Sequence, residues 1–220
     1  MKKLVVFASL LISSVSLFAF DRADWMSNIY LGLGFPIFKT TLEYSGKTED
    51  AKGFGVGFDL KSQAIHLPSG FVVQAGLGLG GARIEDFYAG DPQWGFDLNG
   101  ELGLGYAFIR NKKTVLSLAG VFGYDFSVFK KKVLYNYGGY LYNAEMKSKQ
   151  MVFFLGADLS GTYRFSERLG IYGSILVGIP LFGFGTQSAS NDYRTFSIDI
   201  NAKAGGFYIK PSIGLSISLD

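Results

Sequence analysis

In two stretches of this sequence, apolar residues alternate with small or polar residues at every second position. In 94–108 the even positions are apolar or Gly, whereas the odd positions are small or polar and include Asp97 and Asn99. In 151–165 the odd positions are apolar or small, and the other face carries Asp158 and Arg164. A period of two is typical of a β-strand whose faces meet different surroundings. The pattern predicts an all-β fold.

Aromatic residues stand at both ends of these apolar faces. Phe96 and Tyr106 are ten positions apart with leucines between them, and Phe153 and Tyr163 repeat the spacing. Ten steps along a strand cover about 33 Å. At a tilt of about 40° this becomes roughly 25 Å, the height of the lipid-facing band of an outer-membrane barrel. The spacing predicts that the strands cross a membrane.

Six other segments alternate in the same way. They are 29–37, 54–61, 71–79, 116–126, 169–179 and 207–219. The total of eight is even, as expected for a closed antiparallel bacterial barrel. The sequence therefore predicts an eight-stranded antiparallel transmembrane β-barrel. The alternative is a soluble lipocalin-like barrel with its apolar face inward, but the second face here is mainly Gly, Ser and Ala and suits a narrow interior better.

Short and long connections alternate along the chain. Short turns are expected at 67–70, 110–113 and 166–168, and the tips of longer hairpins near 45–47, 89–91, 138–139 and 190–192. Such barrels have short periplasmic turns and long outer loops. We expect both chain ends on the periplasmic side and taller walls in the last four strands. The apolar phase changes near Gly205–Gly206, which predicts a β-bulge there.

The first residues are typical of a signal peptide. Lys2 and Lys3 precede the apolar run Leu4–Ala19, which is too short to span a membrane as a helix. We expect a signal peptide over 1–19 and the barrel over 20–220. Cleavage after Ser16 and an uncleaved N-terminal helix are the alternatives. Beyond Ala19 the chain has 19 basic and 18 acidic residues, a balance that indicates no nucleic-acid partner.

Residue types that commonly act in catalysis or bind metals are scarce. The chain has no Cys and one His, so thiol catalysis and Cys metal sites are excluded. The Gly-x-Gly pieces lie in predicted strands, without the following helix that a phosphate loop needs. We expect no catalytic residue, no cofactor and no metal, and a protein that is not an enzyme.

The polar residues on the predicted inner face form the first candidate site. They are Asp59, Lys61, Gln74, Asp97, Asn99, Glu101, Asp125, Asp158, Arg164, Tyr172, Lys210 and Ser212. An eight-stranded barrel has room only for side chains or one small ligand, and buried charges need partners. A lumen filled by paired charges is one interpretation. A narrow conduit or pocket is the other, with Tyr30, Phe154, Tyr172 and Tyr208 along it.

The third long hairpin forms the second candidate site. Its basic and tyrosine residues are Lys130, Lys131, Lys132, Tyr135, Tyr137, Tyr140, Tyr142, Lys147 and Lys149. Such residues are common in contact surfaces, and their charge would attract anionic glycans or matrix components. A solvated hairpin stabilised by cross-strand Tyr pairs is the simpler interpretation.

The pattern over 28–219 resembles the small eight-stranded outer-membrane proteins, among them the OmpA membrane domain, OmpX and OmpW. Ser212, Gly214, Ile217 and Leu219 are similar to the terminal signal that such barrels present to their assembly machinery, although the usual terminal aromatic is missing and Asp220 follows. The Gly- and Tyr-rich composition is similar to that of spirochaete barrels.

The resemblance implies a monomer in outer-membrane lipid, with a structural role or a host or matrix ligand. An OmpW-like channel for small, apolar solutes is the alternative. Barrel enzymes of the outer membrane use a His near the outer leaflet, whereas His66 is expected at the periplasmic end.

Overall fold

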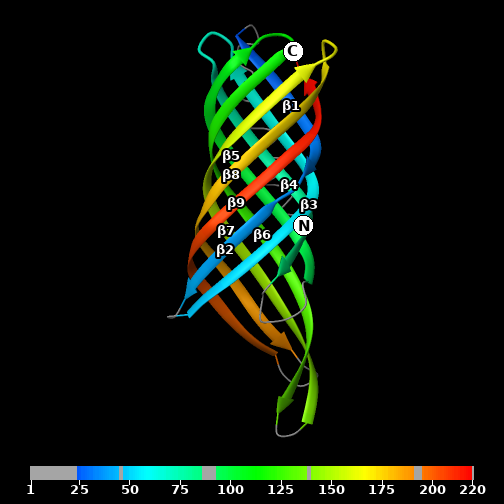
Figure 1. Ribbon diagram of the computed structural model, residues 1–220, viewed down its shortest axis with the longest axis vertical. Helices are drawn as coiled ribbons and strands as arrows, with labels where there is room; N and C mark the ends of the chain where they lie inside the picture. The colour runs from blue at the N-terminus through cyan, green and yellow to red at the C-terminus, as the bar shows by residue number, and fades with distance from the viewer. Residues whose placement is uncertain (1–23, 45–46, 86–92, 138–139, 191–194, 220) are drawn as a thin grey trace.

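The wall of the molecule consists of long antiparallel strands. The computed structural model describes residues 24–44, 47–85, 93–137, 140–190 and 195–219. The strands are β1 (Trp25–Gly34), β2 (Ile37–Tyr44), β3 (Lys47–His66), β4 (Phe71–Glu85), β5 (Gln93–Arg110), β6 (Thr114–Tyr137), β7 (Tyr140–Arg164), β8 (Leu169–Ser190) and β9 (Thr195–Ser218). Each pairs with its neighbours and the sheet closes into a ring (Figure 1).

Two of these strands share one place in the ring. β1 and β2 lie end to end between β3 and β9, and both pair with each of them. They are separated at Phe35 and Pro36, where the proline has no amide hydrogen to donate. The Phe35 amide still donates to the carbonyl oxygen of Pro211 in β9, at 2.9 Å. The wall is therefore eight strands wide, and the predicted eight-stranded barrel is confirmed.

The short turns fall where the alternation placed them. They join β3 to β4, β5 to β6 and β7 to β8. The chain end meets the start of β1 at this same rim, because the Leu219 amide donates to the Ser27 carbonyl oxygen at 3.0 Å. Most residues of the predicted hairpin tips lie outside the described residues. The signal peptide predicted over 1–19 lies outside them too.

The wall is taller on one side. The strands β6 to β9 have 22–25 residues, whereas β3 to β5 have 15–20. The expected taller side is therefore confirmed, and the β6–β7 hairpin projects farthest of the described segments in Figure 1. Within the described ranges, no helix is long and apolar enough to span a membrane.

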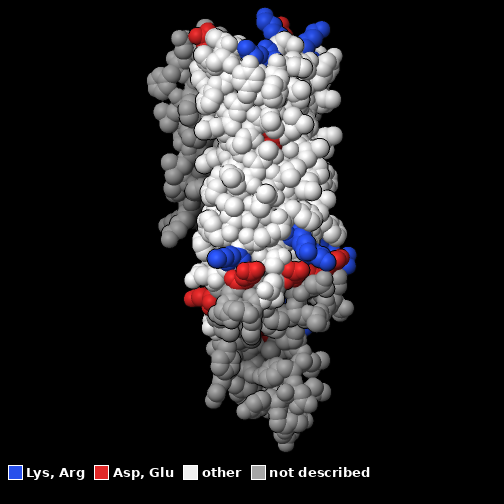
Figure 2. All heavy atoms as spheres, turned by 60° about the vertical axis from the view of Figure 1, so that its left-hand side comes forward, with Lys and Arg blue, Asp and Glu red and all other residues white. Residues whose placement is uncertain are grey.

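The apolar face points outward. Trp94, Phe96, Tyr106 and Phe108 are all exposed, as is Leu102 between them, at 58%. In the view of Figure 2 an almost uncharged belt separates two zones of Lys, Arg, Asp and Glu. An exposed apolar band of this height requires lipid around it. The soluble lipocalin-like alternative, which needs these residues inside, is wrong.

The pairing of β8 with β9 is irregular at the predicted bulge. Between 178 and 182 of β8 the facing part of β9 contains one extra residue. Gly206 lies in that interval with φ of +112°, which Gly adopts far more readily than other residues. The register with β8 therefore shifts where the bulge was expected, whereas β9 pairs with β2 without interruption through Gly205 and Gly206. The break in alternation lies in β8, where Leu181 and Phe182 are both exposed. In β9, Lys203 and Phe207 both face outward, so the change of apolar phase marks the end of the belt rather than a reversal of faces.

A charge placed in the middle of the belt should destabilise the barrel. We expect Leu102→Arg to lower the free energy of unfolding in phospholipid vesicles by about 2–4 kcal/mol, the cost of a cation at mid-bilayer depth. The measurement is reversible denaturant unfolding followed by Trp fluorescence. Lys112→Glu, in an exposed turn, is the control and should change stability by less than about 0.5 kcal/mol. Equal effects of the two substitutions would contradict a lipid-facing belt.

Candidate functional site in the barrel lumen

The polar residues predicted on the inner face all point into the barrel. Most are buried: Lys61, Gln74, Asp97, Asn99, Glu101, Asp158, Arg164, Tyr172, Lys210 and Ser212. Asp59 and Asp125 are partly buried. The reason is the period of the strand, which sends alternate side chains to the same face. Strands from the whole ring thereby contribute to one interior.

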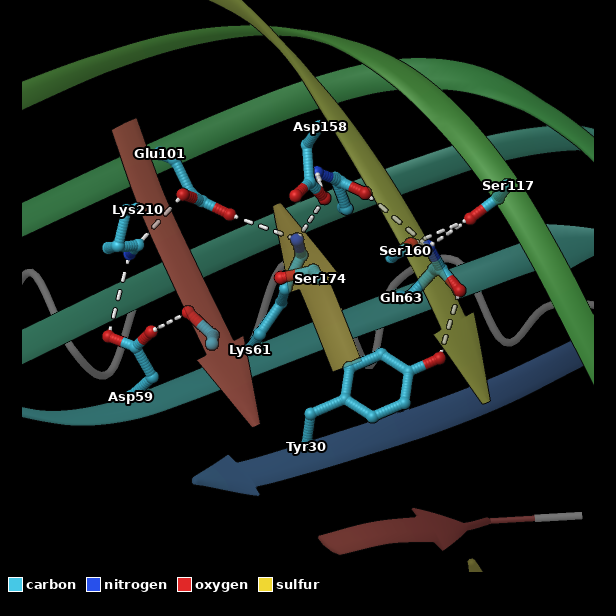
Figure 3. A network of polar contacts seen from close by, with 12 residues as sticks. Tyr30, Asp59, Lys61, Gln63, Glu101, Ser117, Asp158, Ser160, Ser174 and Lys210 are labelled. Carbon is cyan, nitrogen blue, oxygen red and sulfur yellow. Dashed lines mark hydrogen bonds and ion pairs between the residues drawn. The ribbon is translucent and has the colours of Figure 1, made fainter. Parts of the chain in front are cut away.

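Two lysines and three carboxylates meet at the centre (Figure 3). Lys61 of β3 forms ion pairs with Asp158 of β7 and with Glu101 of β5, the latter at 3.2 Å between Nζ and Oε1. Lys210 of β9 lies 3.5 Å from the other Glu101 oxygen and 3.5 Å from Asp59 Oδ1. Glu101 therefore joins the two lysines, and buried charges from four strands form one network.

Neutral groups complete the hydrogen bonds of this network. Lys210 Nζ also donates to Asn99 Oδ1 at 2.9 Å. The Ser212 hydroxyl donates to Asp59 at 2.6 Å, and the Gln74 amide donates to Asp158 at 2.9 Å. These bonds offset part of the cost of removing the charges from water. The centre of the lumen is thus a bonded cluster rather than a row of free charges.

A layer of neutral polar groups lies between this cluster and the short turns. The Gln63 side chain donates to Ser117 at 3.0 Å and to Ser160 at 3.3 Å, and accepts from the Tyr30 hydroxyl at 2.9 Å. Gln63, Ser117 and Ser160 were not among the predicted site residues. Gln63 has the same parity as Asp59 and Lys61, so extending the alternation past Lys61 would have found it.

Apolar side chains close the lumen on both sides. Met26, Ile65, Val72, Ala107 and Val115 pack together near the short turns. Toward the long hairpins, Ala119, Val121, Phe154, Leu176 and Tyr208 form a second cluster, and Ala51, Ala82, Ile84 and Phe129 a third.

The inward aromatics stack in pairs. The ring centroids are 4.1 Å apart for Tyr30 and Tyr172 and 4.7 Å apart for Phe154 and Tyr208. The two cavities described in the lumen have volumes of about 10 and 20 Å³. Such volumes hold about one water each. The described lumen is therefore packed shut in this conformation.

The hairpin residues predicted as a contact surface do not share one face. Lys130, Lys132 and Lys149 are exposed, and Lys147, which is partly exposed, has the same outward parity as Lys149. Lys131 lies at a position that alternates with these and belongs to the inward-facing set of β6. Lys130 forms an ion pair with Glu145 at 3.3 Å.

The hairpin tyrosines pair along the backbone. Tyr135 pairs with Tyr142, and Tyr137 with Tyr140. Their side chains lie outside the described part of the structure.

His66 ends β3 at the short-turn rim. Its Nδ1 lies 2.8 Å from the Ser69 hydroxyl, and its ring centroid lies 5.0 Å from that of Trp25. The apolar cluster of Met26, Ile65, Val72, Ala107 and Val115 lies between His66 and the charged cluster. Among the described residues, no group of three or more His, Asp or Glu is placed to hold a metal ion.

Solved structures with the same fold come from outer membranes. The outer membrane protein OprG from Pseudomonas aeruginosa is 11% identical, with 88% of this chain and 96% of that chain covered, at a TM-score of 0.57. A major outer membrane protein from Thermus thermophilus is 14% identical over 85% and 99%, at a TM-score of 0.55. No family model and no curated protein sequence matches the chain. The similarity shows the fold of a small outer-membrane β-barrel.

Removing one lysine of the central cluster should destabilise the folded barrel. We expect Lys61→Met to lower the free energy of unfolding by about 3–5 kcal/mol, because the buried Asp158 loses its cation and the buried Glu101 keeps only Lys210. Adding Glu101→Gln and Asp158→Asn should restore most of that loss. Denaturant unfolding in one detergent measures both variants. A triple variant less stable than Lys61→Met alone would contradict the assignment.

Proposed function

We propose that this outer-membrane barrel acts through its outer surface, as a structural protein of the membrane whose long hairpins contact the host or the environment. The closed lumen is the observation that carries this proposal. Apolar plugs lie on both sides of a bonded charge cluster, and the two cavities hold about one water each. Passage of a solute through the barrel would need this packing to open.

The tall side of the barrel supports a contact role. β6 and β7 pair without interruption from Thr114–Tyr163 up to Tyr137–Tyr140. Near the far end of this ribbon, Lys130, Lys132, Lys147 and Lys149 have one outward-facing acid among them, Glu145. An excess of cations on a projecting surface attracts anionic polymers through long-range electrostatics. Anionic glycans are the class of ligand that this surface fits.

Export and assembly belong to the same proposal. A signal peptide over 1–19 would be removed, and the chain would reach the membrane as an unfolded strand-forming polymer. Ser212, Gly214, Ile217 and Leu219 would then engage the assembly machinery of the outer membrane. A non-catalytic, monomeric role in lipid is part of the proposal, and a channel for small solutes is the alternative that it opposes.

The lysine surface can be tested with a simple polyanion. We expect dextran sulfate to bind the refolded protein, and the variant with Gln at 130, 132, 147 and 149 to bind roughly tenfold or more weakly, since exposed ion pairs contribute about 0.2–1 kcal/mol each. Surface plasmon resonance at two salt concentrations provides the readout, with neutral dextran as control. Unchanged binding by the Gln variant would contradict the contact role.

Conductance separates the structural role from the channel. We expect no discrete openings from the refolded protein in planar bilayers, because side chains fill its lumen. A large porin serves as the positive control for insertion. A double variant, Phe154→Ala with Tyr208→Ala, tests whether removing the aromatic plug creates a leak. Discrete openings of the unaltered protein that this variant enlarges would favour the channel.

A further inference from the structure

Asp97 and Asp125 form a carboxylate pair apart from the central cluster. They lie on the neighbouring strands β5 and β6, where Asp97 faces Ser127 and Asn99 faces Asp125 in the register. They are therefore diagonal neighbours on the inner face of the sheet, and each carboxyl group acts electrostatically on the other. The Asn99 amide donates to Asp97 Oδ2 at 3.3 Å. Among the described ion pairs none includes either carboxylate.

Three buried oxygens at this place have no hydrogen-bond partner. They are Asp97 Oδ1, Asp125 Oδ2 and the hydroxyl oxygen of Tyr208. Tyr208 comes from β9, is 3% exposed, and its ring stacks on Phe154. Asp125 and Asp97 are the charged groups that act most strongly on its hydroxyl. Buried polar atoms are almost always bonded, so each of these three oxygens is expected to bind a water molecule or an ion.

There is space for a small partner beside Asp125 and Tyr208, whereas Asp97 is not among the residues that line this cavity. The cavity of about 20 Å³ is lined in part by the apolar residues Phe38, Ala51, Val152, Phe154 and Pro180. The rest of its lining is Asp125, Tyr208, Thr40, Ser127 and Gln150, and these five residues carry side-chain oxygen atoms. A cavity of this size accommodates one ion or one water molecule.

The charge of the interior indicates the sign of that partner. The inward carboxylates are Asp59, Asp97, Glu101, Asp125 and Asp158, and the inward cations of the predicted set are Lys61, Arg164 and Lys210. The lysines are engaged by Asp59, Glu101 and Asp158. Two carboxylates side by side in a low dielectric cannot both stay ionised without a counter-charge. Lys210 acts on both of them, but it is already paired with Asp59 and Glu101. A bound cation would supply the remaining counter-charge, and a proton shared by the pair is the alternative.

We propose that Asp97, Asp125 and Tyr208 form a binding site for one hard divalent cation of the Ca²⁺ class. Hard cations take oxygen ligands, with carboxylates as the main charge donors and hydroxyls, amides and waters in the remaining positions. The site has only such donors. Its cation would link β5, β6 and β9 on the long-hairpin side of the central cluster. The site is separate from the outer surface proposed to bind anionic glycans, so either proposal can fail alone.

Terbium luminescence tests the site directly. Tb³⁺ occupies Ca²⁺ sites and emits when a nearby Tyr is excited. We expect the full chain, refolded in detergent free of lipopolysaccharide, to give sensitised emission that Ca²⁺ displaces. Asp97→Asn and Asp125→Asn should each weaken Tb³⁺ binding tenfold or more, since even groups outside the first shell of a metal cost about 10–100-fold. Tyr208→Phe should remove most of the emission.

Stability gives a second readout that does not depend on the probe. We expect Ca²⁺, compared with EDTA, to raise the unfolding midpoint of the unaltered protein because it binds only the folded state. The midpoint of the Asp97→Asn/Asp125→Asn variant should not respond. Asp199→Asn, which alters an exposed acid of β9, is the matched control and should behave like the unaltered protein.

Two results would overturn the proposal. One is Tb³⁺ binding that survives in the double Asn variant, which would place the ion elsewhere. The other is an unaltered protein that shows no emission and no Ca²⁺ response but becomes more stable on mild acidification. The pair would then share a proton.

Discussion

A backbone that crosses lipid has no water with which to satisfy its amides and carbonyls, so every strand must find a partner on both sides. In this chain the condition is met by a ring in which β1 and β2 share the place between β3 and β9. Closure of the ring decides what each side chain meets. Along each regular stretch of strand, alternate side chains face lipid, and the others share with seven other strands a space barely wider than a few side chains.

That confinement explains the order of layers inside. Along β3 the residues Asp59, Lys61, Gln63 and Ile65 point inward in turn, and they belong to the charge cluster, the neutral polar layer and the apolar plug. Charge is kept between apolar layers, away from water, where ion pairs are strong but lone charges are costly.

The alternation of residue types was enough to predict the fold, because lipid imposes it on every strand. It predicted which parity faces inward, from Asp59 to Ser212, and the place of the register shift opposite Gly205–Gly206. It could not predict the partners. Lys61 and Asp158 come from strands across the barrel and are brought together by the ring. The irregularity of β8 opposite Phe153–Phe154 was not predicted either, since the apolar runs on either side of it are continuous in the sequence.

The first and last strands close the wall, and this has a consequence for the time course of folding. Asn28 pairs with Ser218, so the seam joins the two ends of the folded chain. Contacts of such long sequence separation carry the largest loop-closure entropy and form late. Until then β1 and β9 are open edges with unpaired amides. The chain must therefore be held as an open sheet, sheltered from other strands, until its final residues arrive.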